Sequence, residues 1–380
     1  MIRIPLTEVK YDEAEKESVA QVLDSGWITN GPKVAEFENE FAKLVGSKYA
    51  VAVNSCTAAL HLALAALGIG AGDEVIMPAL TFIAGYNSIR YIGAKPVLAD
   101  ITNTDDLTLS PENCNSLITP KTKAIIPMHY GGYLCDMEKL SEISKSHNLI
   151  MIEDAAHAPG SELNGKYAGT WGNSGCFSFF GNKNLVTGEG GMVTTNDKNL
   201  SEKIKLMRSH GMTATSWDKQ SGHAFAYDVV EEGFNYRMTE ITAAIGLTQL
   251  GKLQKHNQIR KKLVEYYREN LKDVSPIQIP FTSYRGTSSF HLFVILVENS
   301  EIRKTLMEFL LENGIGTSIH YPPLYEFTRV KKELIIPEDS LRITKEVSNR
   351  IITLPLHPFL SKNDIDYISE KIKKFFRNKK

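Results

Sequence analysis

Lys183 stands between an apolar, aromatic run and a glycine-rich turn, which is an unusual place for a lysine. The segment reads SFFGNKNLVTGEGG (178–191). A lysine held in a confined site can lose its proton and attack a carbonyl carbon as a neutral amine. Ser178 adds a hydroxyl from the same run that can bind phosphate. The alternative is a surface lysine in a hairpin, and the flanking FSFF and GEGG sequences argue against it.

Asp154 and His157 follow an apolar run in the segment IEDAAH (152–157). A carboxylate at the end of a buried strand needs a partner, because burial of an unpaired charge is costly. A cationic ring nitrogen would be such a partner, while magnesium binding or helix capping are the alternatives. His157 is close enough in sequence to donate or accept a hydrogen bond at the same ligand, although a lone histidine is usually structural.

A third segment, NSCTAA (54–59), joins an expected strand to an expected helix. Its small residues let backbone N–H groups approach an anion, and the helix dipole favours a phosphate at this end. An ordinary Ser/Thr helix cap is the alternative and is favoured for this segment alone. The chain has neither the dinucleotide fingerprint GxGxxG nor the P-loop GxxxxGK[ST] here.

Taken together, the three segments supply a phosphate cradle, an acidic partner for a ring nitrogen and an amine nucleophile. Pyridoxal 5′-phosphate (PLP) needs all three, because an acid must keep its pyridine nitrogen protonated for the ring to accept electrons. We therefore expect Lys183 to hold PLP as a Schiff base.

The elements that would position these residues alternate along the first two-thirds of the chain. Fully apolar runs alternating with helices predict an α/β fold with a mostly parallel sheet covered on both faces. The expected strands are 48–54, 73–78, 95–101, 123–130, 149–156, 175–183 and 190–196, and the expected helices are 56–68, 81–91 and 137–147. Ligands bind at the carboxyl ends of strands in such sheets, where the three segments lie.

The pattern changes from about Leu247. A long charged helix is expected over 249–272, followed by a strand at 288–298 and a helix at 301–315. We predict a large domain over residues 1–248 and a smaller C-terminal α/β domain over 249–380.

Composition excludes several classes. A net charge of −1 with both signs interspersed provides no basic field for nucleic acid or an anionic membrane surface. The cysteines at 56, 114, 135 and 176 fit neither a zinc site nor a redox pair, so we expect free thiols and no metal. The N-terminus lacks an apolar core and no run is long enough to span a membrane, which predicts a cytoplasmic protein.

The chain resembles the DegT family of sugar aminotransferases, which are PLP enzymes of fold type I. The resemblance extends nearly end to end. It rests on SGWITNGPKVAEFENEFAKLVG (25–46), NSCTAALHLALAALGIGAGDEVIMPALTFIA (54–84), EDAAHAPG (153–160), FSFFGNKNLVTGEGGMV (177–193), GFNYRMTEITAAIGLTQL (233–250) and HYPPLY (320–325).

The resemblance implies a role for each matching residue. Lys183 would bind PLP and shuttle protons, Asp154 would pair with the pyridine nitrogen, and His157 would contact the ring oxygen. Phe82 would stack on the ring, while the Thr57 and Ala58 amides and the Ser178 hydroxyl would hold the phosphate. Asn235 would reach the phosphate of a second subunit, which implies a homodimer with shared active sites. The expected substrate-binding residues are Thr29, Asn30, Arg237, His320 and Tyr321.

The same resemblance suggests the substrate. TGEGG (187–191) is similar to the TTGEGG of enzymes that aminate 4-keto sugars. FFGNK (179–183) is similar to perosamine synthases, which act on a GDP-linked 4-keto-6-deoxymannose, with glutamate as amino donor. Asn184-Leu185-Val186 depart from the Thr-Ile-Thr common there, so UDP- and dTDP-linked sugars stay open. A PLP-dependent dehydratase, an amino-acid aminotransferase and a non-catalytic regulator also stay open, and the dehydratase branch carries His in place of Lys183.

Overall fold

The computed structural model describes residues 2–214, 217, 220–222, 225–334 and 340–378. Its centre is a seven-stranded sheet in the order β1-β9-β8-β5-β4-β2-β3. Strands β8, β5, β4, β2 and β3 run parallel to one another, and β9 runs antiparallel to both β1 and β8. The predicted mostly parallel α/β sheet is confirmed. The strands are β1 (Tyr49–Val53), β9 (Gly191–Thr195), β8 (Ser174–Ser178), β5 (Ile150–Asp154), β4 (Thr122–Ile125), β2 (Glu74–Pro78) and β3 (Lys95–Ala99).

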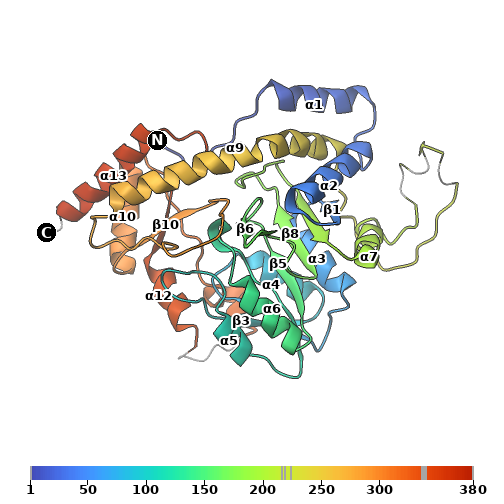
Figure 1. Cartoon of the computed structure of the whole chain (residues 1–380), viewed down its shortest axis with the longest axis horizontal. Coiled ribbons are helices and arrows are strands. Elements are labelled where there is room, and N and C mark those ends of the chain that lie inside the picture. Colours follow the sequence, from blue (N-terminus) through green and yellow to red (C-terminus); the bar gives the residue numbers. More distant parts are fainter. Residues whose placement is uncertain (1, 215–216, 218–219, 223–224, 335–339, 379–380) are drawn as a thin grey trace.

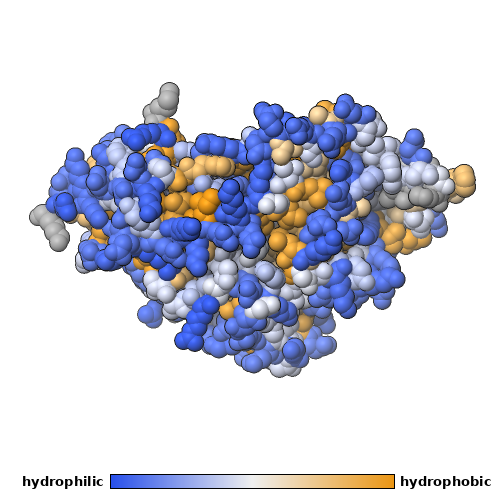
Figure 2. All heavy atoms as spheres, turned by 45° about the horizontal axis from the view of Figure 1, so that its top comes forward, coloured by the Kyte–Doolittle hydropathy of each residue, from blue (hydrophilic) through white to orange (hydrophobic). Residues whose placement is uncertain are grey.

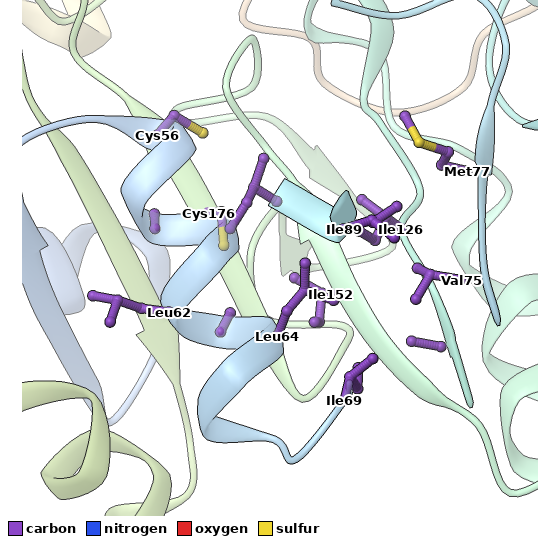
Figure 3. Close-up of a cluster of buried hydrophobic side chains, with 14 of the residues drawn as sticks. Cys56, Leu62, Leu64, Ile69, Val75, Met77, Ile89, Ile126, Ile152 and Cys176 are labelled. Carbon is purple, nitrogen blue, oxygen red and sulfur yellow. The ribbon is translucent and has the colours of Figure 1, made fainter. Parts of the chain in front are cut away.

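Both faces of the sheet are buried, and β1 shows how. Val51 and Val53 pack into one core while Ala50 and Ala52 pack into the other, because successive side chains of a strand point to opposite faces. The first core forms around the apolar helix α3 (Cys56–Ala66), whose Leu64 lies beside Ile152 of β5 in Figure 3.

The other helices of this part are α1 (Glu13–Asp24), α2 (Pro32–Val45), α4 (Ile83–Tyr91), α5 (Pro111–Ser116), α6 (Met137–Ser146) and α7 (Lys198–Arg208), with a 3₁₀ turn η1 (Tyr130–Gly132) and a small hairpin of β6 (Glu162–Leu163) and β7 (Lys166–Tyr167). These helices pack around the sheet, except that α1 packs on helix α9 (Glu240–Leu271) and α5 on α6.

Helix α9 (Glu240–Leu271) crosses most of the molecule and contacts α1 and α2 at one end and α13 (Lys362–Arg377) at the other (Figure 1). It begins nine residues before the expected 249, because Thr239 caps it by accepting a hydrogen bond from the Thr242 N–H. The predicted domain boundary at 248/249 falls inside this helix and stays a prediction.

The C-terminal part has its own core beside α9. An antiparallel pair, β10 (Phe293–Leu296) and β11 (Ile351–Leu354), packs with helices α10 (Ser300–Glu312), α12 (Arg342–Arg350) and α13. A 3₁₀ turn η2 (Leu324–Glu326) and the short helix α11 (Thr328–Lys331) precede α12. The strand expected at 288–298 is shorter, because the Ser288 and Ser289 side chains bond to the Gly132 and His157 carbonyls and fix this stretch against the large sheet.

The surface in Figure 2 is mainly hydrophilic, with apolar residues in patches between polar ones. Within the described residues, no helix combines the length and apolar character needed to cross a membrane. All four cysteines are free, as predicted, and all four are buried.

Candidate active site

A cavity of about 370 Å³ opens where β5 and β8 end and α3 begins. This is the carboxyl edge of the parallel strands, where ligands bind in sheets of this kind. The volume lies within the range of small-molecule sites. Of the residues predicted to form the site, eight line this cavity: Thr57, Phe82, Asp154, His157, Ser178, Lys183, His320 and Tyr321.

Lys183 enters the cavity from the loop between β8 and β9. Its backbone N–H donates to the Phe180 carbonyl at 2.9 Å, which closes a turn directly after the aromatic run. Burial lowers the pKa of the Lys183 amine from 10.5 to about 8, and the charge of Asp154 opposes part of this change. At pH 7 most of the amine is still protonated, but about one-tenth is neutral and can act as a nucleophile or base.

Asp154 is the last residue of β5 and its carboxylate is buried. It accepts a hydrogen bond from the Ala156 N–H at 3.1 Å. Burial raises its pKa, while that hydrogen bond and the charges of Lys183 and His129 lower it. Among the described residues the ionised form lacks a close cation, so a positively charged ligand atom in the cavity would stabilise it.

Glu153 precedes Asp154 but points to the opposite face of β5. Its carboxylate accepts hydrogen bonds from the N–H groups of Gly169, Trp171 and Gly172 and contacts His129 Nε2 at 3.0 Å. Glu153 is therefore saturated within the fold, whereas Asp154 faces the cavity.

His157 lies deep in the cavity wall with a defined tautomer. The Gly131 N–H donates to Nδ1 at 3.3 Å, so the proton of the neutral ring sits on Nε2 and donates to the Tyr321 hydroxyl at 2.9 Å. Burial, together with the charge of Lys183 and the neighbouring histidines, lowers the pKa of His157 well below 6.5. Within the described part of the chain the Tyr321 hydroxyl proton has no acceptor, so it can donate to a ligand.

The anion cradle forms where β9 approaches the first turn of α3. A Cβ placed on Gly191 would lie 2.5 Å from the Ser55 carbonyl carbon and 2.7 Å from the Cys56 nitrogen, so only glycine permits this approach. Ser178, the last residue of β8, presents its hydroxyl to the same space. The positive end of the α3 dipole and this hydroxyl suit a phosphate.

The Ala58 amide has a different partner. It donates to the Ser55 hydroxyl at 3.1 Å, and Ser55 is the N-cap of α3. The capping alternative for this segment is therefore present in the structure, and Ala58 lies outside the residues that line the cavity. Its role toward a phosphate stays a prediction, while Thr57 lies in the lining.

The mouth of the cavity is aromatic. Phe82, the residue before α4, is 56% exposed, and its ring centroid lies 6.0 Å from that of Tyr321. His320 Nδ1 bonds to the Thr353 hydroxyl at 2.9 Å, and burial followed by the charge of Lys183 lowers the pKa of His320 to about 4. A flat ring could stack on Phe82 at this position.

Four predicted residues besides Ala58 lie outside the lining of the cavity. Thr29 and Asn30 precede α2, and the Asn30 side-chain nitrogen is buried without a hydrogen-bond partner within the described structure. Asn235 is exposed and pairs through its backbone with Ser209. Arg237 follows it, and one of its guanidinium nitrogens is likewise buried and unpaired among the described residues.

The cavity also includes residues that the sequence did not mark as functional. Cys56, Met128, Phe180, Asn182 and Glu189 all contribute to its wall. Cys56 begins α3 near Cys176 of β8 (Figure 3), and burial raises the pKa of its thiol well above 9.0. Glu189 could have been found from its place between the turn glycines, while Met128 carried no signal.

The chemical groups that line the cavity match those that PLP needs. A buried acid without a close cation matches the pyridine nitrogen, an anion cradle matches the phosphate, and a desolvated amine matches the aldehyde. No cluster of metal-ligating side chains occurs among the residues described here.

Comparison with known proteins agrees with this fit. The family model described as the DegT/DnrJ/EryC1/StrS aminotransferase family matches residues 9–373. The chain is 38% identical over 375 residues to the spore coat polysaccharide biosynthesis protein SpsC of Bacillus subtilis, covering 97% of this chain and 96% of SpsC.

Solved structures agree as well. Helicobacter pylori PseC, an aminotransferase involved in the biosynthesis of pseudoaminic acid, superposes with a TM-score of 0.91 at 30% identity, covering 99% of each chain. The PLP form of Spr1654 from Streptococcus pneumoniae superposes with a TM-score of 0.91 at 32% identity, again over 99% of each chain. The same protein is known in a PMP form, at a TM-score of 0.92. This chain belongs to the DegT/DnrJ/EryC1/StrS family and is a PLP-dependent sugar aminotransferase.

Proposed function

We propose that this enzyme transfers the amino group of L-glutamate to C4 of a nucleotide-linked 4-keto-6-deoxy sugar. GDP-4-keto-6-deoxymannose, which would give GDP-perosamine, is the leading substrate, and UDP- or dTDP-linked 4-keto sugars are the alternatives. The observation that carries the proposed chemistry is the Lys183 amine, with its pKa lowered to about 8, in one cavity with the buried Asp154. The choice of C4 rests on the similarity of TGEGG (187–191) to 4-keto enzymes.

Lys183 is proposed as the proton carrier. PLP, when bound, supplies the electron sink and carries the amino group between the two substrates. With PLP bound, Lys183 Nζ would take the proton from Cα of glutamate in the first half-reaction and give a proton to C4 of the sugar in the second, in each case exchanging it with C4′ of the cofactor. An amine with a pKa near 8 suits both directions, because both of its protonation states are populated near neutral pH.

The other lining residues are proposed to hold the cofactor. The Asp154 carboxylate would face the ring nitrogen and His157 the ring oxygen, while Phe82 would stack on the ring. Thr57 and Ala58, through their backbone amides, and Ser178, through its hydroxyl, would bind the phosphate. The Ala58 amide would have to leave or share its bond to Ser55 to take part.

Substrate recognition is assigned to Thr29, Asn30, Arg237, His320 and Tyr321. One guanidinium nitrogen of Arg237 has no partner in the described part of the chain, which supports a role toward an anionic group such as the diphosphate. Burial, and then the charge of Arg208, lowers the Arg237 pKa, which is the direction expected for a cation without a counter-ion.

We also propose a homodimer with shared active sites. Asn235 is exposed and lies outside its own cavity, which leaves it free to reach the phosphate of a second copy. The nearby exposed apolar residues support a covered surface: Phe225, Tyr227, Val229 and Val230.

Free buried cysteines support a cytoplasmic location, because reduced thiols persist in a reducing compartment. The names of SpsC and PseC concern polysaccharide and pseudoaminic acid biosynthesis. We propose an amino-sugar pathway for this chain too, with O-antigen or lipopolysaccharide synthesis as the leading context.

The test is a panel of GDP-, UDP- and dTDP-linked 4-keto-6-deoxy sugars with glutamate, with products identified by mass and NMR. Stoichiometric formation of a 4-amino sugar and 2-oxoglutarate is expected, and Lys183→Ala should abolish it while still binding PLP and sugar. Release of a deoxygenated sugar without glutamate use would instead indicate a dehydratase, and normal turnover by Lys183→Ala would refute the role of Lys183.

A further inference from the structure

Asn184 follows Lys183 directly, and the similarity to perosamine synthases left it unexplained. Its side chain is 5% exposed and points away from the cavity, into the contact between the lysine loop and the C-terminal part of the chain. A buried amide has four hydrogen-bonding positions that must be satisfied or pay a desolvation cost.

The hydrogen bonds of Asn184 define its orientation. Its Nδ2 lies 2.7 Å from the Ser289 carbonyl, which can only accept, and 2.8 Å from Asn257 Oδ1 on α9. Asn257 Nδ2 in turn donates to the Pro159 carbonyl at 3.0 Å, which confirms that its Oδ1 is an acceptor. The Asn184 amide therefore donates both of its protons, and its Oδ1 accepts.

His291 is the donor to that oxygen. Its Nδ1 lies 3.0 Å from Asn184 Oδ1, so the proton of the neutral ring must sit on Nδ1. Burial, and then the charges of Lys183, Arg260 and His320, holds the His291 pKa well below 6.5, in agreement with a neutral ring.

The same short stretch also holds His157. The His291 N–H donates to the Gly131 carbonyl at 2.9 Å, and the Gly131 N–H donates to His157 Nδ1. The His291 and His157 rings lie 4.3 Å apart between centroids, and the Ser289 hydroxyl donates to the His157 carbonyl at 2.6 Å. The stretch of residues 289–291 thus contacts both His157, which lines the cavity, and Asn184, the neighbour of Lys183.

We propose that Asn184, His291 and Asn257, the Asn184 network, are positioning residues that fix the backbone beside Lys183 so that its amine returns to one place in the cavity. The inference rests on the proposed role of Lys183. A lysine side chain has four rotatable bonds, and between the two proton transfers nothing covalent holds it. Asn184, the next residue in the chain, is held by hydrogen bonds both to α9 and to residues 288–291. These bonds restrict the motion of the loop, which would otherwise add to the motion of the Lys183 side chain.

Two readouts test the Asn184 network in the full-length protein. The first is the pKa of Lys183 without cofactor, from the pH dependence of its acetylation rate measured by mass spectrometry. The second is the rate at which added PLP becomes fixed to Lys183, trapped by borohydride and located by peptide mapping. Asn184→Ala should raise the Lys183 pKa by at least about one pH unit, because a loosened loop lets water reach the amine, and should slow fixation about tenfold.

Conservative variants separate hydrogen bonding from shape. His291→Asn keeps a donor near the Nδ1 position and should retain most of the wild-type rate. His291→Phe keeps a ring but no donor, and should behave like Asn184→Ala. Asn184→Asp keeps the size but cannot donate to Asn257 and Ser289, so it should be at least as impaired.

Asn113→Ala is the matched control, because the Asn113 side chain accepts a 2.7 Å bond from the Asp100 N–H, away from the cavity. It should lower the melting temperature without moving either readout. If Asn184→Ala and His291→Phe also lower only the melting temperature and leave the Lys183 pKa and the fixation rate unchanged, the network is merely structural and the inference is wrong. If wild-type PLP is trapped on another lysine, the proposed function fails instead, and the acetylation comparison still decides whether the network positions Lys183.

Discussion

Replacing Lys183 by methionine should stabilise the cofactor-free protein at neutral pH. Methionine is similar in length and fills an apolar site well, but it carries no charge. Burial lowers the Lys183 pKa from 10.5 to about 8, so at pH 7 the folded protein holds a protonated amine in a site that disfavours it. That difference corresponds to about 3 kcal/mol, an upper value because water reaches part of the side chain.

The pH dependence has a defined sign. Below pH 8 the amine is protonated in both the folded and the unfolded chain, so the folded state carries the full penalty. Between pH 8 and 10.5 the unfolded chain binds more protons, and the stability of the wild type rises with pH. Above 10.5 the penalty is gone. The advantage of Lys183→Met should therefore be greatest below pH 8 and fade toward pH 10.5.

Thermal unfolding of both proteins between about pH 6.5 and 10.5 measures this difference. For a chain of 380 residues, about 3 kcal/mol corresponds to about 4 °C in melting temperature. Lys304→Met, at an exposed position on α10, is the control and should show no such dependence. A Lys183→Met protein that is less stable than wild type at neutral pH, with a difference independent of pH, would refute the claim that burial destabilises the charged amine.

Three further predictions concern the cofactor. Asp154→Asn should retain the fold but lower kcat by at least about a hundredfold, since an amide cannot hold a proton on the ring nitrogen; pre-steady-state kinetics with glutamate measures this. Asn235→Ala should weaken PLP retention in proportion to the dimer population, measured by ultracentrifugation and cofactor absorbance, and a strictly monomeric active enzyme would contradict it. Gly191→Ala should destabilise the protein by about 1–3 kcal/mol in a denaturation assay and weaken phosphate binding. The control is Gly251→Ala on α9, where nothing lies within 4 Å of the new Cβ, and it should be neutral or stabilising in that assay.

Much of the fold could be predicted because its signals are local. Apolar runs such as 149–156 and the intervening helices indicated the parallel sheet, and β5 is observed at Ile150–Asp154. The hydrophobic periodicity could not predict that β9 runs antiparallel to its neighbours, because a buried strand has the same composition in either direction. The shortened strand at 293–296 depended on the hydrogen bonds of Ser288 and Ser289 to distant carbonyls, which no local pattern encodes.

The site divides in the same way. Lys183, Asp154 and Ser178 were accessible because each ends or follows an apolar strand, and strand ends converge at one edge of a parallel sheet. Arg237 and Asn235 came only from resemblance, and within this chain they lie outside the cavity lining. In the sequence, Asn184 was only a difference from perosamine synthases. Its role could not be predicted because its partners, Asn257 and His291, are distant in sequence.

Glu153 and Asp154 show why burial alone does not identify a functional acid. Both are buried, at 0% and 6% exposure, and sequence offers no difference in type that would rank them. Successive side chains of β5 point to opposite faces of the sheet, so Glu153 points toward three backbone N–H groups and His129, which satisfy its charge within the fold. Asp154 receives one N–H at 3.1 Å and faces a cavity that also contains a lysine. Of the two acids, Asp154 is the one without a close cation among the residues that the structure describes, and it is therefore available to a cationic ring. The unsatisfied charge, not the burial, marks the site.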